Sequence, residues 1–484
     1  MKTFLFQMLI LAMIAFLNAC TSQEISKPNI IVIFTDDHGY ADLGEQGYVD
    51  DLKTPNLDQL ARDGVRMTSG YVTAPQCIPS RAGLISGQYQ QKLGVDHNGT
   101  IPMPLDVTLL PARMQEAGYT TGMAGKWHLE PNHTQKAWIL ENMPELGDKE
   151  QYKPSDIPFE KKLPYFPSQK GFQETYYGEM RRYYANYDLE GNSIDFQYIP
   201  DDRFRVDVQT DAALAFIKRN HDKPFFFYLA YFAPHVPLEA TEKYLSRFPG
   251  DMPERRRYCL AMVSAMDDGV GKIKDALKQY GIEENTMIFF IGDNGAPLKI
   301  YKEDIPVSFP GGAWDGSLND PLNGEKGMVS EGGIRVPFLV SWPAKFPKNM
   351  VYDEPVISLD VAATSLAAAG LDIAPELDGV NLIPYLTGKK KGAPHESLFW
   401  EFWSQAAIRK GDWKLLEAGG KQYLFDLSKD IAEQNNLVQE YPEKVEELKK
   451  DLEGWAKKHK DGSLPKETFN SQENDWYGYY FKNN

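Results

Sequence analysis

Short apolar runs alternate with amphipathic helical patterns along most of this 484-residue chain. The apolar runs have the length and continuity of strands that are buried on both faces. They lie at 29–35, 224–231, 286–291 and 336–342. The helical patterns lie at 56–63, 109–117, 206–220, 259–280 and 359–369. Strands that alternate with helices predict an α/β fold with a doubly wound, mostly parallel sheet flanked by helices.

The character of the chain changes near residue 397. A charged helical pattern covers 442–458, and before it come four short segments rich in aromatic and aliphatic residues, separated by turn residues. These segments are 397–403, 406–410, 413–418 and 421–427. They predict a small antiparallel sheet with a helix. We therefore expect a large α/β domain over 28–375 and a C-terminal subdomain over 376–484, and we expect the Pro-rich, charged stretch at 141–170 to be a surface insertion.

The N-terminus resembles a secretory signal. Lys2 precedes an apolar run over 4–17 that is short for a membrane span, and Cys20 follows it. A small residue just before Cys20, with Leu17 three residues ahead, is similar to the bacterial lipoprotein signal. We expect 1–19 to be a lipoprotein signal peptide, with a plain secretory signal as the alternative. Either signal predicts export to the periplasm or cell surface, and the lipoprotein signal predicts an outer-membrane lipoprotein that contacts the membrane only through lipid on Cys20.

The formal net charge of −16 argues against a nucleic-acid-binding protein. Such proteins neutralise phosphates with a basic surface, so no nucleic-acid partner is expected. An anionic small molecule would also be repelled at long range. Any site for an anionic substrate must therefore concentrate Lys, Arg and His side chains locally.

The chain has three cysteines, Cys20, Cys77 and Cys259. Cys259 lies in a segment whose apolar residues recur at helical spacing, and we expect it to be a buried structural thiol. If Cys20 carries lipid, the other two are the only possible disulfide pair. A structural Cys259 then leaves Cys77 unpaired in an exported protein, which suggests a functional reason for its presence.

Polar residues follow two of the predicted strands at their carboxyl ends. Asp36 and Asp37 come after the first strand, and Asp293 and Asn294 come after the strand at 286–291. An Asp-Asp pair by itself is usually a solvated loop. Three carboxylates and an amide oxygen at one edge of a sheet, however, form a hard-oxygen site suited to Ca²⁺ or Mg²⁺. No pair of Cys and His residues has the spacing of a zinc site.

Between these two strands lies the segment 74–87. Pro79 is placed to begin a helix, with Cys77 at its N-terminal end. This position would lower the pKa of the thiol and direct backbone N–H groups toward an anion. The simpler interpretation is a helix-capping segment with an incidental cysteine.

Cys77-Ile78-Pro79-Ser80-Arg81, followed by Ser86-Gly87, resembles the signature of the type I, formylglycine-dependent sulfatases of the alkaline phosphatase superfamily. Further segments of that family are matched in the same order along the chain. They are GYTTGMAGKWH at 118–128, APHVP at 233–237, GEK at 324–326, EGGIRVP at 331–337 and, in the C-terminal subdomain, YLFDL at 423–427 with Asn436-Leu437. Ser86 departs from the Thr that the family commonly has, but it keeps the hydroxyl group.

The resemblance implies an alkaline phosphatase-like fold and a sulfuric ester hydrolase. In the family, the cysteine at the position of Cys77 is oxidised to formylglycine (3-oxoalanine), and the hydrated aldehyde supplies the nucleophilic oxygen. The partner for this modification would be a formylglycine-generating enzyme or an anaerobic sulfatase-maturating enzyme. The resemblance also implies one Ca²⁺, held by Asp36, Asp37, Cys77, Asp293 and Asn294.

The other catalytic residues implied by the resemblance are Arg81, Lys126, His128, His235 and Lys326. The two lysines and His235 would bind sulfate, and His235 or Lys326 would protonate the departing alcohol. Arg81 or Asp293 would favour deprotonation of the nucleophile, and His128 would take a proton from the second hydroxyl group so that sulfate leaves. Outside these motifs, such residues would be surface lysines and structural histidines.

Four further features keep both a structural and a functional interpretation. They are His38, His97-Asn98, the run Arg181-Arg182-Tyr183-Tyr184, and Trp314. His38 lies beside the predicted metal ligands, and the other three are candidates for contacts with a sugar.

The export signal and the family resemblance favour a bacterial sulfatase that acts on a sulfated oligosaccharide or polysaccharide. Two alternatives are a phosphonate or phosphate ester hydrolase of the same superfamily, and a non-catalytic surface lipoprotein that binds sulfated glycans through an unconverted Cys77.

Overall fold

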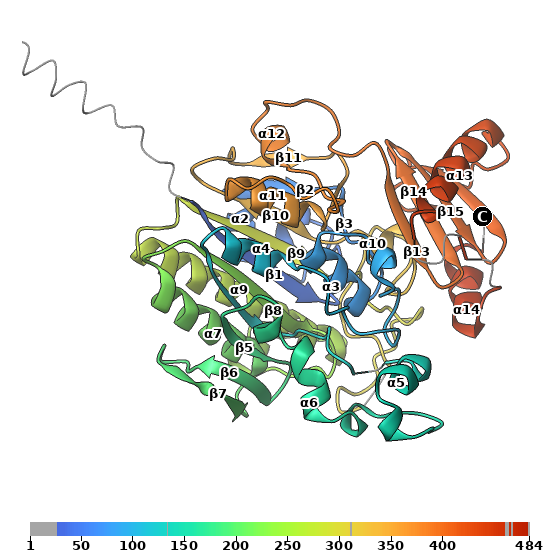
Figure 1. Cartoon of the computed structure of the whole chain (residues 1–484). Coiled ribbons are helices and arrows are strands. Elements are labelled where there is room, and N and C mark those ends of the chain that lie inside the picture. The colour runs from blue at the N-terminus through green and yellow to red at the C-terminus, as the bar shows by residue number, and fades with distance from the viewer. Residues whose placement is uncertain (1–26, 133, 310–311, 460–463, 466–467, 483–484) are drawn as a thin grey trace, which may run out of the picture.

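The computed structural model describes residues 27–132, 134–309, 312–459, 464–465 and 468–482 (Figure 1). The predicted signal peptide at 1–19 and Cys20 lie outside the described residues. Within the described part of the chain, every helix is too short or too polar to cross a membrane.

A ten-stranded sheet forms the centre of the molecule (Figure 1), and its strand order is β11-β2-β10-β9-β1-β8-β4-β5-β6-β7. The strands are β1 (Asn29–Asp36), β2 (Val65–Met67), β4 (Thr120–Gly125), β5 (Glu174–Gly178), β6 (Arg182–Tyr187), β7 (Ser193–Pro200), β8 (Phe225–Pro234), β9 (Thr286–Gly292), β10 (Phe338–Ser341) and β11 (Met350–Tyr352). The five central strands, from β9 to β5, are mutually parallel. Antiparallel pairs flank them on both sides. The prediction of a mostly parallel sheet is confirmed.

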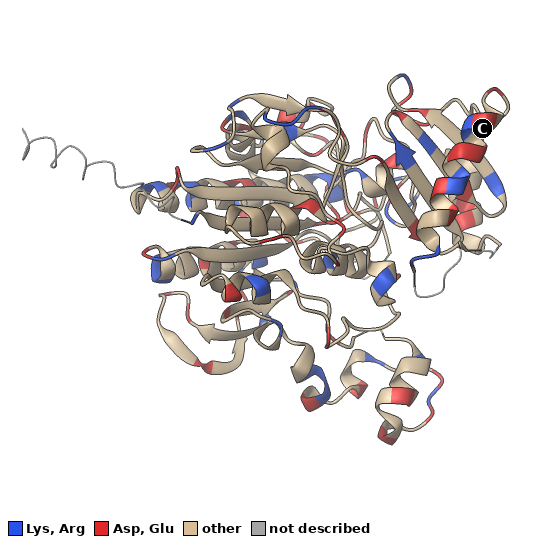
Figure 2. Cartoon of the chain, turned by 45° about the horizontal axis from the view of Figure 1, so that its top comes forward, with Lys and Arg blue, Asp and Glu red and all other residues tan. Residues whose placement is uncertain are grey.

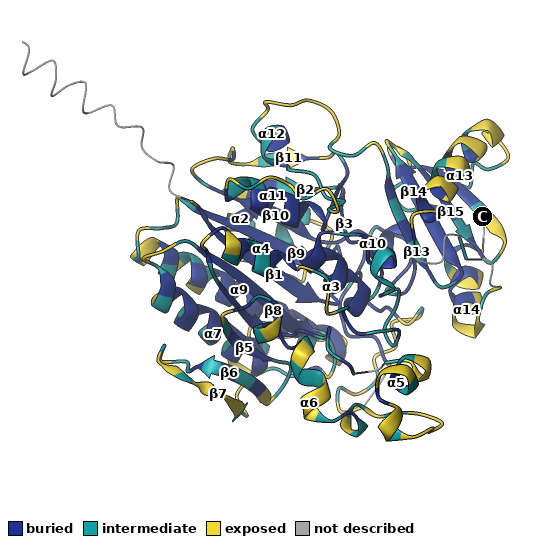
Figure 3. Ribbon diagram, viewed as in Figure 1, coloured by how far each residue is buried: buried dark blue, intermediate teal, exposed yellow. Residues whose placement is uncertain are grey.

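Helices cover both faces of this sheet because successive side chains of a strand point to opposite faces. In β1, Ile30 and Val32 pack on one face and Ile31 and Ile33 on the other. The helices on the first face are α3 (Cys77–Ser86), α4 (Leu110–Glu116) and α11 (Asp360–Ala368). Those on the second face are α2 (Pro55–Arg62), α7 (Arg205–Asn220) and α9 (Glu254–Gln279). Figure 3 shows the central strands fully buried between the two helical layers, as expected for a doubly wound fold.

The predicted surface insertion at 141–170 begins at the end of α5 (Lys136–Asn142) and contains α6 (Phe159–Lys162). It is largely exposed in Figure 3 and has its own small apolar cluster of Ile139, Met143 and Ile157. Short elements of the large domain are β3 (Gly70–Tyr71), α8 (Glu242–Leu245), α10 (Glu331–Ile334) and β12 (Val356–Ile357). Helix α12 (Ile383–Leu386) follows, and its Tyr385 and Leu386 join the apolar core on the first face of the sheet.

The C-terminal part of the chain forms the predicted antiparallel sheet, with strand order β13-β14-β15-β16. Its elements are β13 (Leu398–Phe402), β14 (Gln405–Lys410), β15 (Trp413–Ala418), β16 (Lys421–Asp426), α13 (Pro442–Ala456) and α14 (Ser471–Tyr480). Helix α14 was not predicted. Its N-terminus is closed by a capping box between Asn470 and Glu473, and Trp476 and Tyr477 bury it against the sheet. The division of the chain at residue 375 stays a prediction.

A fully buried ion-pair network joins the C-terminal sheet to the large domain. Lys414, on β15, lies 2.9 Å from Glu331 of α10 and 2.9 Å from Glu433, and none of the three side chains is exposed. Buried carboxylates are tolerated only when they are paired. The network therefore fixes the small sheet against the EGGIRVP segment that follows Lys326.

Replacing Lys414 with Met should lower the free energy of unfolding by about 3–5 kcal/mol, because two buried carboxylates lose their partner. Urea unfolding measures the loss. The matched control is Lys410→Met on β14, whose partly exposed ammonium group lies 2.8 Å from Asp451. That change should cost less than about 1 kcal/mol, as for other surface pairs. Equal costs for the two variants would show that the buried network does not hold the sheets together.

Candidate active site

The predicted oxygen ligands meet because β1 and β9 are parallel neighbours. Thr35 pairs with Gly292, so the residues that follow the two strands leave the sheet at the same edge. The backbone N–H of Asp37 donates to Asp293 Oδ1 at 3.0 Å, and the Asn294 amide donates to Asp37 Oδ1 at 2.6 Å. Asp37 has a left-handed φ of 60°, a strained conformation that turns the chain just past the strand. The four predicted ligands, Asp36, Asp37, Asp293 and Asn294, are all buried. The Asp36-Asp37 pair is therefore not a solvated loop.

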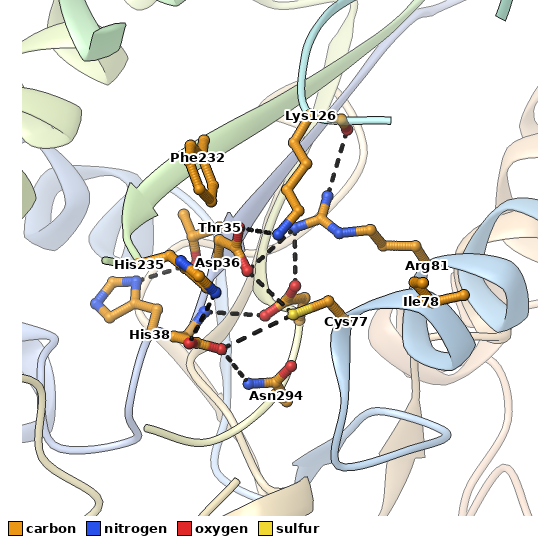
Figure 4. Close-up of polar contacts among 12 residues, drawn as sticks. Thr35, Asp36, His38, Cys77, Ile78, Arg81, Lys126, Phe232, His235 and Asn294 are labelled. Atoms are coloured by element: carbon orange, nitrogen blue, oxygen red, sulfur yellow. Dashed lines mark hydrogen bonds and ion pairs between the residues drawn. The ribbon is translucent and has the colours of Figure 1, made fainter. Parts of the chain in front are cut away.

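Cys77 is the first residue of α3, as predicted, and its side chain points at the carboxylates (Figure 4). Its Sγ lies 3.4 Å from Asp36 Oδ1 and 3.3 Å from Lys326 Nζ. The backbone N–H of Ile78, in the first turn of α3, donates to Asn98 Oδ1 at 3.0 Å. Asn98 therefore caps the helix that carries the cysteine. Cys77 and Cys259 are both free thiols, as expected, and both are buried, which the sequence predicted only for Cys259.

The predicted lowering of the Cys77 pKa is wrong. Burial raises the pKa of this thiol well above its usual value, and the charges of Asp36 and Asp293 raise it further. Lys126 and Lys326 oppose this increase without overcoming it. A helix N-terminus lowers a thiol pKa in a partly exposed setting, whereas here desolvation is the larger effect. Cys77 is therefore held as a neutral thiol rather than as a thiolate nucleophile.

Three cations surround this cluster, although acidic and basic residues are otherwise scattered over both parts of the molecule (Figure 2). Lys126 Nζ lies 2.7 Å from Asp36 Oδ2, and Lys326 Nζ lies 2.6 Å from Asp37 Oδ1. Arg81 NH2, from the same helix as Cys77, lies 2.7 Å from Asp293 Oδ2. Burial lowers the pKa of both lysines, but the neighbouring carboxylates outweigh it and raise each pKa above its usual value. The site thus holds the positive charge that an anionic substrate requires in this acidic chain.

His235 completes the cluster beyond the end of β8. Its Nε2 lies 3.6 Å from Asp37 Oδ2, and its Nδ1 lies 2.5 Å from the carbonyl oxygen of Val236. Phe232 packs on His235 with ring centroids 4.9 Å apart, and the same ring lies 4.7 Å from Lys126 Nζ. Burial lowers the pKa of His235 to about 4. The imidazole is therefore neutral at neutral pH when no anion is bound.

His128 is the one predicted catalytic residue without a described polar contact to the cluster. Its Nδ1 is buried without a hydrogen-bond partner among the described residues, and its φ is 63°. Burial, together with the charges of Lys126 and Arg81, lowers its pKa well below the usual value. The residue is thus a neutral imidazole near the cations, with a free nitrogen.

The residues for which the sequence left both a structural and a functional role open lie in different surroundings. Both ring nitrogens of His38 are occupied, by Thr35 Oγ1 at 3.1 Å and the carbonyl oxygen of Asp42 at 2.6 Å, which indicates a structural role. The Trp314 indole is buried and donates to the Ser317 carbonyl oxygen at 2.7 Å. Arg181 is exposed. Sequence reasoning also missed two residues of the buried strand β8: Phe232, described above, and Tyr228, whose hydroxyl lies 3.4 Å from Arg81 NH1. The only signal for Phe232 was its place near the carboxyl end of that strand, and Tyr228, in the first half of the strand, had none.

The donor set fits a hard divalent cation. Donor atoms of Asp36, Asp37, Cys77 and His235 lie within 4.8 Å of one another. Asn294 Oδ1 is buried without a hydrogen-bond partner among the described residues, although its amide nitrogen is fully used. Burial, with repulsion from Asp36 and Asp37, raises the pKa of Asp293 to about 7 against the opposing charges of Arg81 and Lys126. Three carboxylates and an unpartnered amide oxygen are ligands that Ca²⁺ prefers.

The fold and the site together define an α/β enzyme whose buried centre, beyond the carboxyl ends of parallel strands, is built for an anionic substrate. Comparison with known proteins identifies its family. Residues 28–371 match the family profile described as Sulfatase, and residues 324–459 match the one described as N-sulphoglucosamine sulphohydrolase, C-terminal. The chain therefore belongs to the sulfatase family and is a sulfuric ester hydrolase.

Individual relatives agree with this assignment. The sequence is 33% identical over 416 residues to the uncharacterized sulfatase YdeN of Escherichia coli (strain K12), covering 77% of this chain and 68% of that protein. It is 31% identical over 432 residues to Arylsulfatase J of Mus musculus, covering 81% of this chain and 64%, less than two thirds, of the mouse protein. The fold also matches the crystal structure of Ps i-CgsB in complex with k-i-k-neocarrahexaose with a TM-score of 0.73. The two sequences are 29% identical, and the match covers 93% of this chain and 97% of that chain.

Proposed function

We propose that this sulfatase removes sulfate ester groups from a sulfated oligosaccharide or polysaccharide. The observation that carries the proposal is the position of Cys77 Sγ, 3.4 Å from Asp36 and 3.3 Å from Lys326 in a buried, cation-rich centre. The carbohydrate assignment is supported by the similarity to Ps i-CgsB, whose crystal structure is a complex with k-i-k-neocarrahexaose.

We propose further that Cys77 acts after oxidation to formylglycine by a formylglycine-generating or anaerobic sulfatase-maturating enzyme. A buried thiol whose pKa is raised is a poor nucleophile and a poor ligand for a hard cation. The hydrated aldehyde would supply an oxygen nucleophile at this position. The same oxygen would suit a site made of carboxylate and amide oxygens.

One Ca²⁺ would be held by Asp36, Asp37, the oxygen at position 77, Asp293 and Asn294. When bound, it would withdraw charge from a sulfate oxygen and lower the pKa of the nucleophile. Arg81 holds the Asp293 carboxylate at 2.7 Å and thereby orients one member of this ligand set.

The remaining residues have roles that follow from their charges. Lys126 and Lys326 would bind the sulfate oxygens from two sides of the cluster, since each already contacts one of the two strand-end carboxylates. His235 or Lys326 would protonate the departing sugar hydroxyl group. The negative charge of a bound sulfate ester near His235 would raise its low pKa and favour the protonated form that such an acid needs. His128, neutral with an unpartnered nitrogen, would accept the proton whose removal releases sulfate.

We also propose that the chain is exported as a lipoprotein, in the periplasm or on the cell surface, on the basis of the signal-like sequence before Cys20. Labelling with a radioactive fatty acid tests this proposal. Label on the wild-type protein that a Cys20→Ala variant lacks is expected. If the wild-type protein and the variant are exported equally and neither carries label, the N-terminus is a plain secretory signal.

The activity is tested by parallel rates on an aryl sulfate and an aryl phosphonate ester, followed by a panel of defined sulfated oligosaccharides. We expect a strong preference for sulfur and release of sulfate from at least one oligosaccharide. A strong preference for phosphorus would favour the phosphonate or phosphate ester hydrolase. A Cys77 peptide that keeps its thiol in protein from the native host, together with no turnover, would favour the glycan-binding lipoprotein.

A further inference from the structure

Two tyrosines, Tyr301 and Tyr479, form an exposed aromatic pair on the surface. Tyr301 is 68% exposed and Tyr479, on α14, is 39% exposed. Their rings meet edge to face, with centroids 5.4 Å apart. Exposed aromatic pairs of this kind cost solvation free energy in a monomer, and they usually mark a surface that binds something.

The loop that presents Tyr301 has an unusual backbone. Lys299, Ile300 and Lys302 all have left-handed φ angles, between 50° and 62°. Non-glycine residues keep such conformations only where the surrounding structure enforces them. Here the enforcing group is the carboxylate of Glu325, which accepts from the N–H of Lys299 at 2.5 Å and from the N–H of Ile300 at 3.0 Å. The loop is therefore held in place rather than free.

The same contacts connect the aromatic surface to the active site. Glu325 directly precedes Lys326, whose ammonium group contacts Asp37 and Cys77. Helix α14 reaches this segment as well, because the Trp476 ring packs so closely on Gly327 that a Cβ there would lie 2.3 Å from it. The two tyrosines are thus connected, through Glu325 and Gly327, to the segment that carries Lys326.

Three lysines lie in the segments that carry the two rings. Lys299, Lys302 and Lys482 are exposed, and Lys482 Nζ lies 5.6 Å from the centre of the Tyr479 ring. Among the described residues, none of the three ammonium groups forms an ion pair. Of the carboxylates in these segments, Glu325 holds the loop and Asp304 accepts the N–H groups at the start of α9. Glu303 and Asp475 are exposed in the same segments and offset part of the positive charge. In a chain of net charge −16, three free cations beside two aromatic rings complement a ligand that is both anionic and able to stack.

We propose that Tyr301 and Tyr479, with Lys299, Lys302 and Lys482, form a binding surface for a sulfated glycan chain that extends beyond the sulfate being hydrolysed. The apolar faces of sugar rings would stack on the tyrosines, and further sulfate groups would contact the lysines. This inference rests on the proposed function. It adds that the enzyme binds several sugar units of a chain rather than a single sulfated sugar.

The test compares a long and a short substrate in the double variant Tyr301→Ala/Tyr479→Ala. With k-i-k-neocarrahexaose, or the hexasaccharide that the panel identifies, KM should rise roughly tenfold, because the stacking of two rings is lost. With an aryl sulfate, kcat/KM should stay within about twofold of wild type, because that substrate does not reach the surface. The matched control is Tyr441→Ala, which removes an exposed tyrosine (45% exposed) that packs on Trp413 of the C-terminal sheet. It should leave both substrates unaffected.

A second measurement separates this inference from the proposed function. Affinity gel electrophoresis with carrageenan, fucoidan, chondroitin sulfate and heparin measures binding without turnover. At least one polymer should retard the wild-type protein, and the double variant should be retarded less. Release of sulfate from short substrates without retardation by any polymer would overturn the binding surface and leave the sulfatase function standing. If the wild-type protein is retarded but releases no sulfate, and the double variant is not retarded, the binding surface would stand and the sulfatase function would be overturned. An unchanged hexasaccharide KM in the double variant would also overturn the inference.

Discussion

Replacing Cys77 with Ala is expected to lower kcat/KM for an aryl sulfate by about 10⁴-fold or more. The side chain at position 77 is the only one of the cluster that contacts both Asp36 and Lys326. The surrounding carboxylates and ammonium groups can orient a nucleophile but cannot replace it. The cations remain in the variant, so substrate should still bind while turnover is lost.

The other buried cysteine provides the matched control. Cys259, in α9, is as deeply buried as Cys77 but lies outside the cluster. Cys259→Ala should cost about 1 kcal/mol of stability through the small cavity it leaves, with activity within a few-fold of wild type. Thermal unfolding of both variants separates loss of chemistry from loss of fold. Turnover that persists in Cys77→Ala protein matured in its own host would refute the assignment of the nucleophile.

A Cys77→Ser variant distinguishes an aldehyde from a simple hydroxyl nucleophile. Expressed without a maturating enzyme, its single hydroxyl group could attack sulfur once. The resulting sulfate ester has no second hydroxyl group to expel it, so the protein should stop with a mass about 80 Da higher. Conversion of the wild-type thiol to an aldehyde replaces sulfur and two hydrogens by oxygen, which lowers the mass by about 18 Da. Intact mass thus reports both states, and multiple turnover by unmodified Ser protein would contradict the need for the aldehyde.

The central strands were predictable because burial on both faces leaves a continuous apolar run, as in β1 and β8. Strand β4 was not predicted, and its sequence explains why. It contains Gly122 and Gly125, where a Cβ would lie 2.2 Å from the Phe216 ring and 1.9 Å from the Ala230 carbonyl oxygen. Close packing against α7 and β8 requires small residues there, and small residues remove the apolar signal. Helix α14 lacked helical periodicity, but its capping box was visible in the sequence as Asn470 and Glu473.

The convergence of Asp37 and Asn294 followed from parallel strands that end at one edge of a sheet. The pKa of Cys77 could not be inferred in the same way, because the position at a helix N-terminus is local whereas the depth of burial depends on the whole fold. The contacts around the segment that carries Lys326 also come from residues far away in the sequence. The Gln405 side chain, on β14, donates to the Gly327 carbonyl oxygen at 2.9 Å and accepts from the Val329 N–H at 3.1 Å. No pattern near either residue predicts that contact.

Removal of divalent cations is expected to have the second large effect. Incubation with EDTA should lower sulfate release by about 10³-fold, and added Ca²⁺ should restore it. The physical reason is that three buried carboxylates converge with the unpartnered Asn294 Oδ1 into a set of oxygen donors suited to a divalent cation. A cation that binds the folded state alone should also stabilise it, by about 2.7 kcal/mol when its concentration is about 100 times Kd. Melting temperatures with and without Ca²⁺ therefore report binding independently of turnover.

The Asn294→Leu variant tests the ligand set directly, because it removes the unpartnered Oδ1 while nearly keeping the side-chain shape. If the loss of this ligand raises Kd about 100-fold, the stabilisation by the same Ca²⁺ concentration falls to about 0.4 kcal/mol. Asn220→Leu is the control, since Asn220 in α7 is also a buried amide with an unpartnered Oδ1 but lies far from the carboxylates in the fold, at the opposite end of β8. Its own stability should fall, yet its shift with Ca²⁺ should equal that of wild type. An equal shift in both variants would exclude Asn294 as a ligand, and no shift in the wild-type protein would exclude calcium from this cluster.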